Sequence, residues 1–138
     1  MKVLYVLAAV AMACGPAAAA EWKSSEDKGL RLYSLIDGSA RLDLVCDPEG
    51  LWEPAEFHLS VIPSGAVLTG SSLTATKGDE SVTLPVASGA VLGRDAEAWN
   101  KLIGMISEPG TVTFVSDATS VAITFDASRE GDCLRPLP

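Results

Sequence analysis

The stretch that decides the fold class is Ala-Arg-Leu-Asp-Leu-Val-Cys at residues 40–46. Apolar and polar side chains alternate along it, as expected for a strand with one face in the core and the other in solvent. The apolar face carries Ala40, Leu42, Leu44 and Cys46. Arg41, Asp43 and, beyond the stretch, Asp47 lie on the opposite face. The stretch therefore predicts a half-buried β-strand.

The same period of two residues returns along the chain, at 57–61, 82–86, 112–114 and 121–125. Turn sequences rich in Gly, Pro and Asp, such as Asp37-Gly38 and Pro109-Gly110, separate these segments. Many short strands at regular spacing predict a mainly β fold, an antiparallel β-sandwich or barrel. No long Pro/Ser linker divides the chain, so we predict a single β-rich domain over residues 21–138.

One segment departs from this pattern. From Asp95 the apolar residues fall at Trp99, Leu102, Ile103 and Ile106, the spacing of one face of a helix. Asp95 can cap the first turn, and Glu108-Pro109-Gly110 ends the segment. We predict one short α-helix at about 95–107, with Trp99 anchoring it in the core.

Residues 1–20 have the layout of a cleaved signal peptide. A positive start is followed by an apolar run and then by Ala18, Ala19 and Ala20 before the charged Glu21. The apolar run is too short to span a membrane, and no transmembrane segment is predicted in the mature chain. We expect a periplasmic or secreted protein cut near Ala20. Acylation at Cys14, which would make a lipoprotein, is the alternative.

Two cysteines, Cys46 and Cys133, remain after removal of the leader. In an exported protein such a pair predicts a disulfide. It would close a loop of 88 residues, counted from 46 to 133 inclusive, worth roughly 4–5 kcal/mol in the chain-entropy model. No C-x-x-C motif accompanies them, which disfavours a catalytic thiol.

The formal net charge is −8, and loss of Lys2 with the leader makes it −9. Such a charge disfavours binding to nucleic acids or to anionic lipid surfaces. It is compatible with a cationic partner, with calcium, or with solubility alone. We predict no cofactor.

The candidate binding site is the irregular segment 47–56, which follows the predicted disulfide. Its candidate residues are Asp47, Glu49, Trp52, Glu53 and Glu56. An aromatic side chain among acids on a tethered loop suits recognition of a basic partner. Alternatively, Trp52 folds back onto the sheet.

No catalytic or metal-ligating residue is assigned. The single histidine, His58, lies in a predicted strand, and no G-x-S-x-G motif is present. Two alternatives stay open: a small secreted hydrolase that uses His58 and the nearby acids, and a calcium-stabilised envelope protein whose acidic loop supplies oxygen ligands.

The order of the predicted parts is also informative. Trp22 follows the cleavage site, a strand closes on Cys46-Asp47, and short strands and a brief helix precede two terminal strands at Thr111–Val115 and Val121–Phe125. This layout is similar to that of the small exported bacterial proteins related to invasion-associated locus B. The resemblance implies a β-sandwich that acts in the envelope or at a host contact, with no catalytic residues to carry over. We therefore predict an exported, non-enzymatic binding or accessory protein of the bacterial cell envelope with a protein partner.

Overall fold

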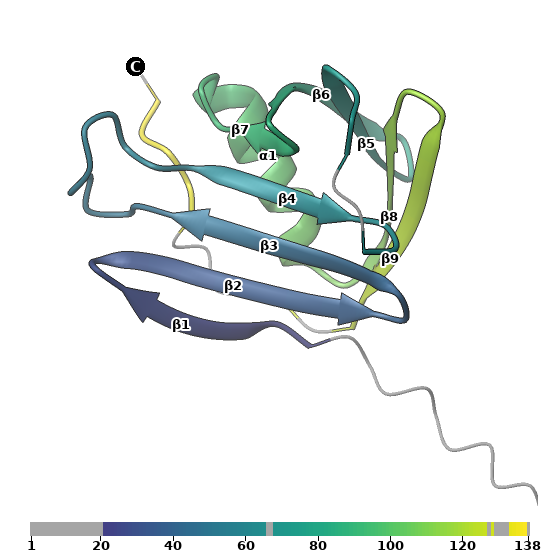
Figure 1. The fold of residues 1–138 in the computed structure, drawn as a ribbon, viewed down its shortest axis with the longest axis horizontal. Helices are drawn as coiled ribbons and strands as arrows, with labels where there is room; N and C mark the ends of the chain where they lie inside the picture. The colour runs from purple at the N-terminus through teal and green to yellow at the C-terminus, as the bar shows by residue number, and fades with distance from the viewer. Residues whose placement is uncertain (1–20, 66–67, 127, 129–132, 138) are drawn as a thin grey trace, which may run out of the picture.

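The computed structural model describes residues 21–65, 68–126, 128 and 133–137. These residues form nine strands and one helix (Figure 1). The strands are β1 (Lys23–Asp27), β2 (Leu30–Asp37), β3 (Ala40–Cys46), β4 (His58–Ile62), β5 (Ser72–Lys77), β6 (Glu80–Ala87), β7 (Ala90–Leu92), β8 (Gly110–Ser116) and β9 (Thr119–Phe125). The helix, α1 (Ala96–Ser107), follows β7. The predicted signal peptide and Cys14 lie outside the described residues.

The strands form one antiparallel sheet in the order β1-β2-β3-β4-β7-β6-β5-β8-β9. The prediction of a mainly β fold with one short helix is confirmed, although the sheet does not close into a barrel. β6 connects the two parts of the sheet, because residues 80–85 pair with β5 while Val86 and Ala87 pair with β7. Figure 1 shows β1–β4 as a layer in front of α1, with β8 and β9 at its side.

The register of β2, β3 and β4 builds the core from the predicted apolar face. Leu42 lies between Leu35 and Val61, and the neighbouring row joins Tyr33, Leu44 and Leu59. All six side chains are buried. Alternation on one strand thus becomes rows of contacting apolar side chains across three strands, which is how a sheet face is stabilised.

The two ends of the sheet come together, although they do not pair. Trp22, just before β1, stacks on Phe125 at the end of β9, with ring centroids 5.8 Å apart. Asp37, at the end of β2, accepts a hydrogen bond through Oδ2 from the backbone N–H of Thr124 at 3.1 Å. The hydrogen bond satisfies an outward-facing N–H group of the edge strand β9. Without it, that group would be open to pairing with a strand of another chain.

The helix begins and ends near the predicted residues. The Asp95 carboxylate accepts a hydrogen bond from the backbone N–H of Ala98 at 3.1 Å, the expected N-cap. At the other end, Lys77 Nζ donates to the carbonyls of Met105 and Glu108 at 2.9 and 3.0 Å. Trp99 is fully buried, as predicted. α1 has 12 residues, and within the described part of the chain no helix is long and apolar enough to cross a membrane.

Candidate functional site

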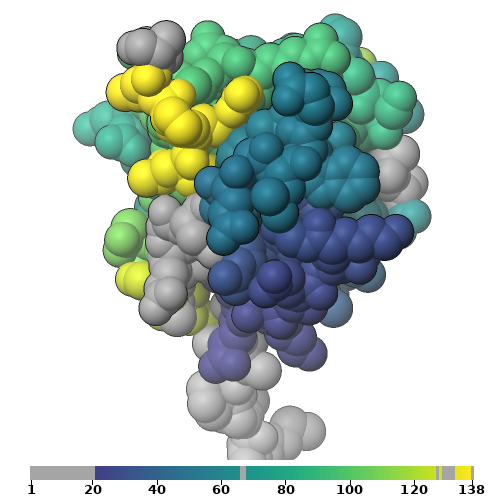
Figure 2. Space-filling model, turned by 90° about the vertical axis from the view of Figure 1, so that its left-hand side faces the viewer, coloured from purple at the N-terminus to yellow at the C-terminus, as the bar shows by residue number. Residues whose placement is uncertain are grey.

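The predicted binding loop and the C-terminal tail form one surface of the molecule. The predicted segment 47–56 lies in the connection between β3 and β4, residues 47–57, which we call the loop, and the tail comprises residues 133–137. Figure 2 shows the blue-green loop directly beside the yellow tail. A disulfide joins Cys46, where the loop begins, to Cys133, with Cα atoms 5.2 Å apart. The predicted disulfide is therefore confirmed.

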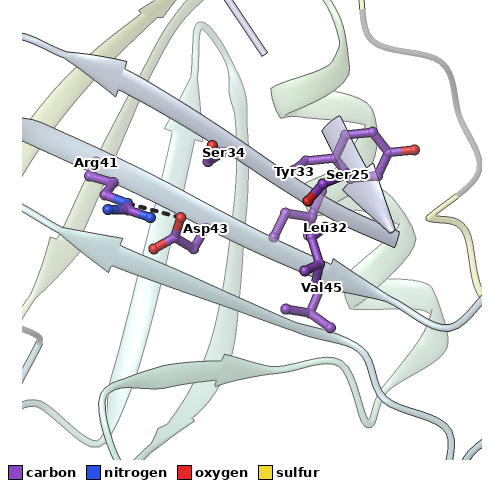
Figure 3. A pocket seen from close by; sticks show the side chains of 8 residues that line it. Ser25, Leu32, Tyr33, Ser34, Arg41, Asp43 and Val45 are labelled. Carbon is purple, nitrogen blue, oxygen red and sulfur yellow. Dashed lines mark hydrogen bonds and ion pairs between the residues drawn. The ribbon is translucent and has the colours of Figure 1, made fainter. Parts of the chain in front are cut away.

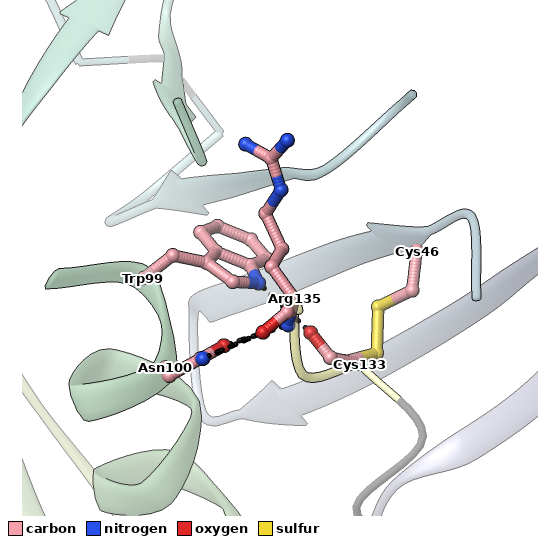
Figure 4. Close-up of a disulfide and its surroundings, with 5 residues drawn as sticks. All are labelled: Cys46, Trp99, Asn100, Cys133 and Arg135. Carbon is pink, nitrogen blue, oxygen red and sulfur yellow. Dashed lines mark hydrogen bonds between the residues drawn. A yellow bond between two sulfur atoms is a disulfide. The ribbon is translucent and has the colours of Figure 1, made fainter. Parts of the chain in front are cut away.

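Contacts with α1 fix the backbone of the tail (Figure 4). Trp99 Nε1 donates a hydrogen bond to the carbonyl of Cys133 at 2.8 Å. The side-chain amide of Asn100 contacts both backbone groups of Arg135: Oδ1 accepts from its N–H at 2.7 Å, and Nδ2 donates to its carbonyl at 2.8 Å. Asn100 thus pairs with the tail as a neighbouring strand would.

The Arg135 side chain connects the tail to the loop. Its guanidinium carbon lies 5.1 Å from the centre of the Phe57 ring, a cation–π contact. One of its nitrogens donates to the carbonyl of Gly93. Asn100, Phe57 and Arg135 were not predicted from the sequence as members of this surface. No local pattern relates residues that lie 35 to 78 positions apart, the separations of Asn100 and of Phe57 from Arg135.

Asp47, predicted as a binding residue, instead organises the loop. Its side chain is 1% exposed, and its carboxylate accepts hydrogen bonds from the backbone N–H groups of Leu51, Trp52 and Glu56, at 2.8, 2.9 and 3.4 Å. A carboxylate that fills its acceptor sites with backbone amides holds a loop in one conformation. The loop therefore presents its other side chains on a fixed backbone.

The electrostatics of Asp47 follow from these contacts. Burial by itself would raise the pKa of this carboxyl, but hydrogen bonds from the amides of Trp52, Leu51, Glu56 and Gly50 lower it. The amides prevail, and the pKa lies below its ordinary value. Asp47 is therefore ionised in the folded protein at neutral pH.

Asp47→Asn is expected to lower the free energy of unfolding by about 2 kcal/mol at neutral pH, because Asn has one neutral acceptor oxygen and its NH2 group cannot accept from the loop amides. The folded-state pKa lies below the unfolded value of about 3.9, so the stabilisation by ionised Asp47 is complete above that value. It is lost as the pH falls through the lower folded-state pKa. Urea unfolding at about pH 7 and about pH 2.5 measures this difference.

The matched control is Glu49→Gln, which changes the same charge at an exposed position of the same loop. We expect it to alter stability by less than about 0.5 kcal/mol at either pH. Equal effects of the two substitutions at neutral pH would contradict the role assigned to Asp47.

The other predicted loop residues lie at the surface. Glu49 and Glu53 are exposed, and Trp52 is 42% exposed, so it does not fold back fully onto the sheet. Its neighbour Leu51, at 60% exposed, lies against the β1–β2 turn, where a Cβ on Gly29 would meet its Cδ1. Within the described residues, no three His, Cys, Asp or Glu side chains are grouped so as to hold a metal ion.

His58, the residue of the hydrolase alternative, lies on the outer face of β4 opposite Val45 and Leu92. Its Nδ1 is 3.5 Å from Glu56 Oε2. Among the described residues, no serine hydroxyl is hydrogen-bonded to His58. His58 borders a depression of about 390 Å³ with Phe57, Arg94 and Arg135.

A second depression, of about 240 Å³, lies on the outer face of β1, β2 and β3 (Figure 3). Leu32 and Val45 border it together with Arg41 and Asp43. The Arg41 Nε and Asp43 Oδ1 atoms are 3.0 Å apart, so these two charges already pair with each other. Ser25 and Ser34 add hydroxyl groups to its border.

Comparison of the chain with protein-family models, with curated proteins and with solved structures finds no match. The resemblance to the proteins related to invasion-associated locus B therefore stays a prediction.

Proposed function

We propose that this is an exported protein of the bacterial cell envelope that acts without catalysis, by binding a protein partner. The binding surface would consist of Leu51, Trp52, Leu134 and Leu137, which we call the loop–tail surface. The proposal rests on the location of the large exposed apolar side chains. Six are found among the described residues, and these four belong to the loop and the tail. Large apolar side chains exposed on two neighbouring segments are typical of interaction sites.

The rigidity of the backbone supports the same proposal. The disulfide ties the loop to the tail, Asp47 holds the loop amides, and Asn100 holds the tail. A surface that is already ordered loses little conformational entropy on binding, so more of its contact energy contributes to affinity. Trp52 provides a large aromatic side chain of the kind that dominates interface energetics.

The charge around Trp52 favours a basic partner. Glu49 and Glu53 are exposed beside it, and the whole chain is acidic, with a formal net charge of −8. Such a field would increase the rate of encounter with a cationic protein surface and would exclude acidic ones. The disulfide is compatible with the oxidising compartment that the predicted leader implies.

Site-specific photocrosslinking in the native bacterium tests this proposal. A photoreactive amino acid in place of Trp52 is expected to form a discrete adduct with one protein, and the same amino acid in place of Val115, exposed on β8, is not. With that partner purified, Trp52→Ala is expected to raise the Kd by about tenfold or more. Identical adducts from both positions, no adduct from position 52, or an unchanged Kd would each refute the loop–tail surface as the binding site.

A further inference from the structure

The depression beside β4 and β7 gathers positive charge on an acidic protein. It has a volume of about 390 Å³ and is bordered by residues 54–58, residues 92–94 and Arg135. Arg94 and Arg135 both border it, and both also border the adjoining depression at the start of α1. Two arginines therefore share one hollow on a chain that has 18 acids and 10 Lys and Arg residues.

Neither arginine forms an ion pair within the part of the chain that the structure describes. Arg31 pairs with Glu26, and Arg41 pairs with Asp43. Among the described residues Arg94 has no such carboxylate partner, and the guanidinium of Arg135 contacts a ring and a carbonyl instead. A guanidinium has five N–H donors, so both arginines retain donors for an anion.

Arg135 is also held in place before any ligand arrives. Asn100 fixes its backbone on both sides, the Phe57 ring lies under its guanidinium, and the Gly93 carbonyl accepts from it. The chain at Gly93 is tightly packed, because an added Cβ would come within 2.8 Å of Trp99 and 2.9 Å of Phe57. A fixed guanidinium loses little entropy when it binds an anion, which increases affinity.

One acid borders the depression itself: Glu56, whose Oε2 lies 3.5 Å from Nδ1 of His58, another residue of the border. The Asp95 carboxylate caps the helix through Ala98. Glu97 borders only the adjoining depression and is exposed. The walls between these groups are apolar and include Pro54, Ala55 and Leu92.

We propose that this depression is a binding site for the carboxylate or phosphate group of a small soluble ligand, with Arg94 and Arg135 as its cationic contacts. The apolar walls would cover an uncharged part of the same ligand. A phosphate could come from a soluble ester or from a lipid headgroup. The soluble source is favoured because the exposed acids of the loop and the acidic surface as a whole repel an anionic membrane. This site does not use Trp52, so it stands independently of the proposed protein partner.

Phenyl phosphate is a suitable probe, since it combines the anionic group with a flat apolar body. In an NMR titration of the purified disulfide-bonded protein we expect saturable shifts at the amides of Gly93, Arg94 and Arg135. Arg94→Gln is expected to raise the Kd by about fivefold or more. Arg94 is exposed and forms no hydrogen bond with another described residue, so this variant should fold normally.

Arg41→Gln is the matched control, because it removes the same charge from the outer face of β3. It should leave the Kd unchanged. Equal weakening by both variants would show general charge attraction and overturn the proposal, as would the absence of saturable shifts at residues 93–94 and 135. Cosedimentation with phosphatidylglycerol vesicles, lost in Arg94→Gln while phenyl phosphate fails to bind, would overturn the soluble source in favour of a lipid headgroup. Loss of the Trp52 crosslink has no bearing on this titration.

Discussion

Replacement of both Cys46 and Cys133 by Ser is expected to lower the free energy of unfolding by about 4 kcal/mol, close to the chain-entropy value for a loop of this length. The bridge spans a sequence separation of 87 residues, so the unfolded chain gains much freedom when it is lost. Both cysteines are fully buried in the folded protein. For a single small domain this is a large part of the total stability. Urea unfolding of the variant and of the wild type measures the difference.

The location of the bridge predicts a second effect. Cys133 is the point where the tail enters the surface, and beyond it Arg135 is held by hydrogen bonds with Asn100 and by the contact with the Phe57 ring. Without the bridge, hydrogen exchange at the Arg135 amide should accelerate more than exchange in β8 and β9, which pair with each other. The double Ser variant is the informative one, because a single substitution leaves a free thiol. A decrease of less than about 1 kcal/mol in the free energy of unfolding would contradict the entropic explanation of the bridge's effect.

Most of the fold follows from local patterns. The alternation at 40–46 identifies β3, and the register across β2 and β4 turns its apolar face into the core. The i, i+3, i+4, i+7 spacing after Asp95 identifies α1, because only a helix places Trp99, Leu102 and Ile106 on one face. These patterns work because burial of one face is the main energetic demand on each element.

β1, β2, β5 and β7 were not predicted, and the first two were missed for different reasons. In β2, Tyr33 and Leu35 are buried, but Leu32 and Ile36 on the outer face are apolar as well, so the alternation is hidden. β1 is exposed at every residue and lacks apolar side chains altogether. Its pairing with β2 arises from the backbone and from the Lys28-Gly29 turn, where both residues have positive φ.

The candidate site was predicted only in part. The sequence locates the loop and its disulfide, because both depend on residue types that stand out locally. It does not reveal that Asp47 is buried, since an acid beside Pro and Gly is also typical of an exposed turn. Nor does it place Arg135 over Phe57, because that contact depends on where the whole tail returns. Tertiary structure alone determines which acids are exposed and which cations gather.

Trp99→Ala is expected to lower the free energy of unfolding by about 3–5 kcal/mol. The side chain is 0% exposed, its ring meets Phe57 edge to face at 6.1 Å, and it packs against the backbone of Gly93. Truncation therefore leaves a cavity the size of an indole between α1, β7 and the tail. The same change removes the hydrogen bond to the Cys133 carbonyl, which contributes about 1 kcal/mol more.

Two further variants separate these contributions. Trp99→Phe keeps most of the packing but removes the N–H donor, so we expect a smaller loss of stability together with faster exchange at the Arg135 amide. Trp52→Ala truncates the same residue type where it is 42% exposed, and should cost less than about 1 kcal/mol. If Trp99→Ala lowers the free energy of unfolding by no more than Trp52→Ala does, then α1 does not anchor the tail through Trp99. If the difference is as large as expected, Trp99 stabilises the fold, and Trp52 is left available for contact with a partner.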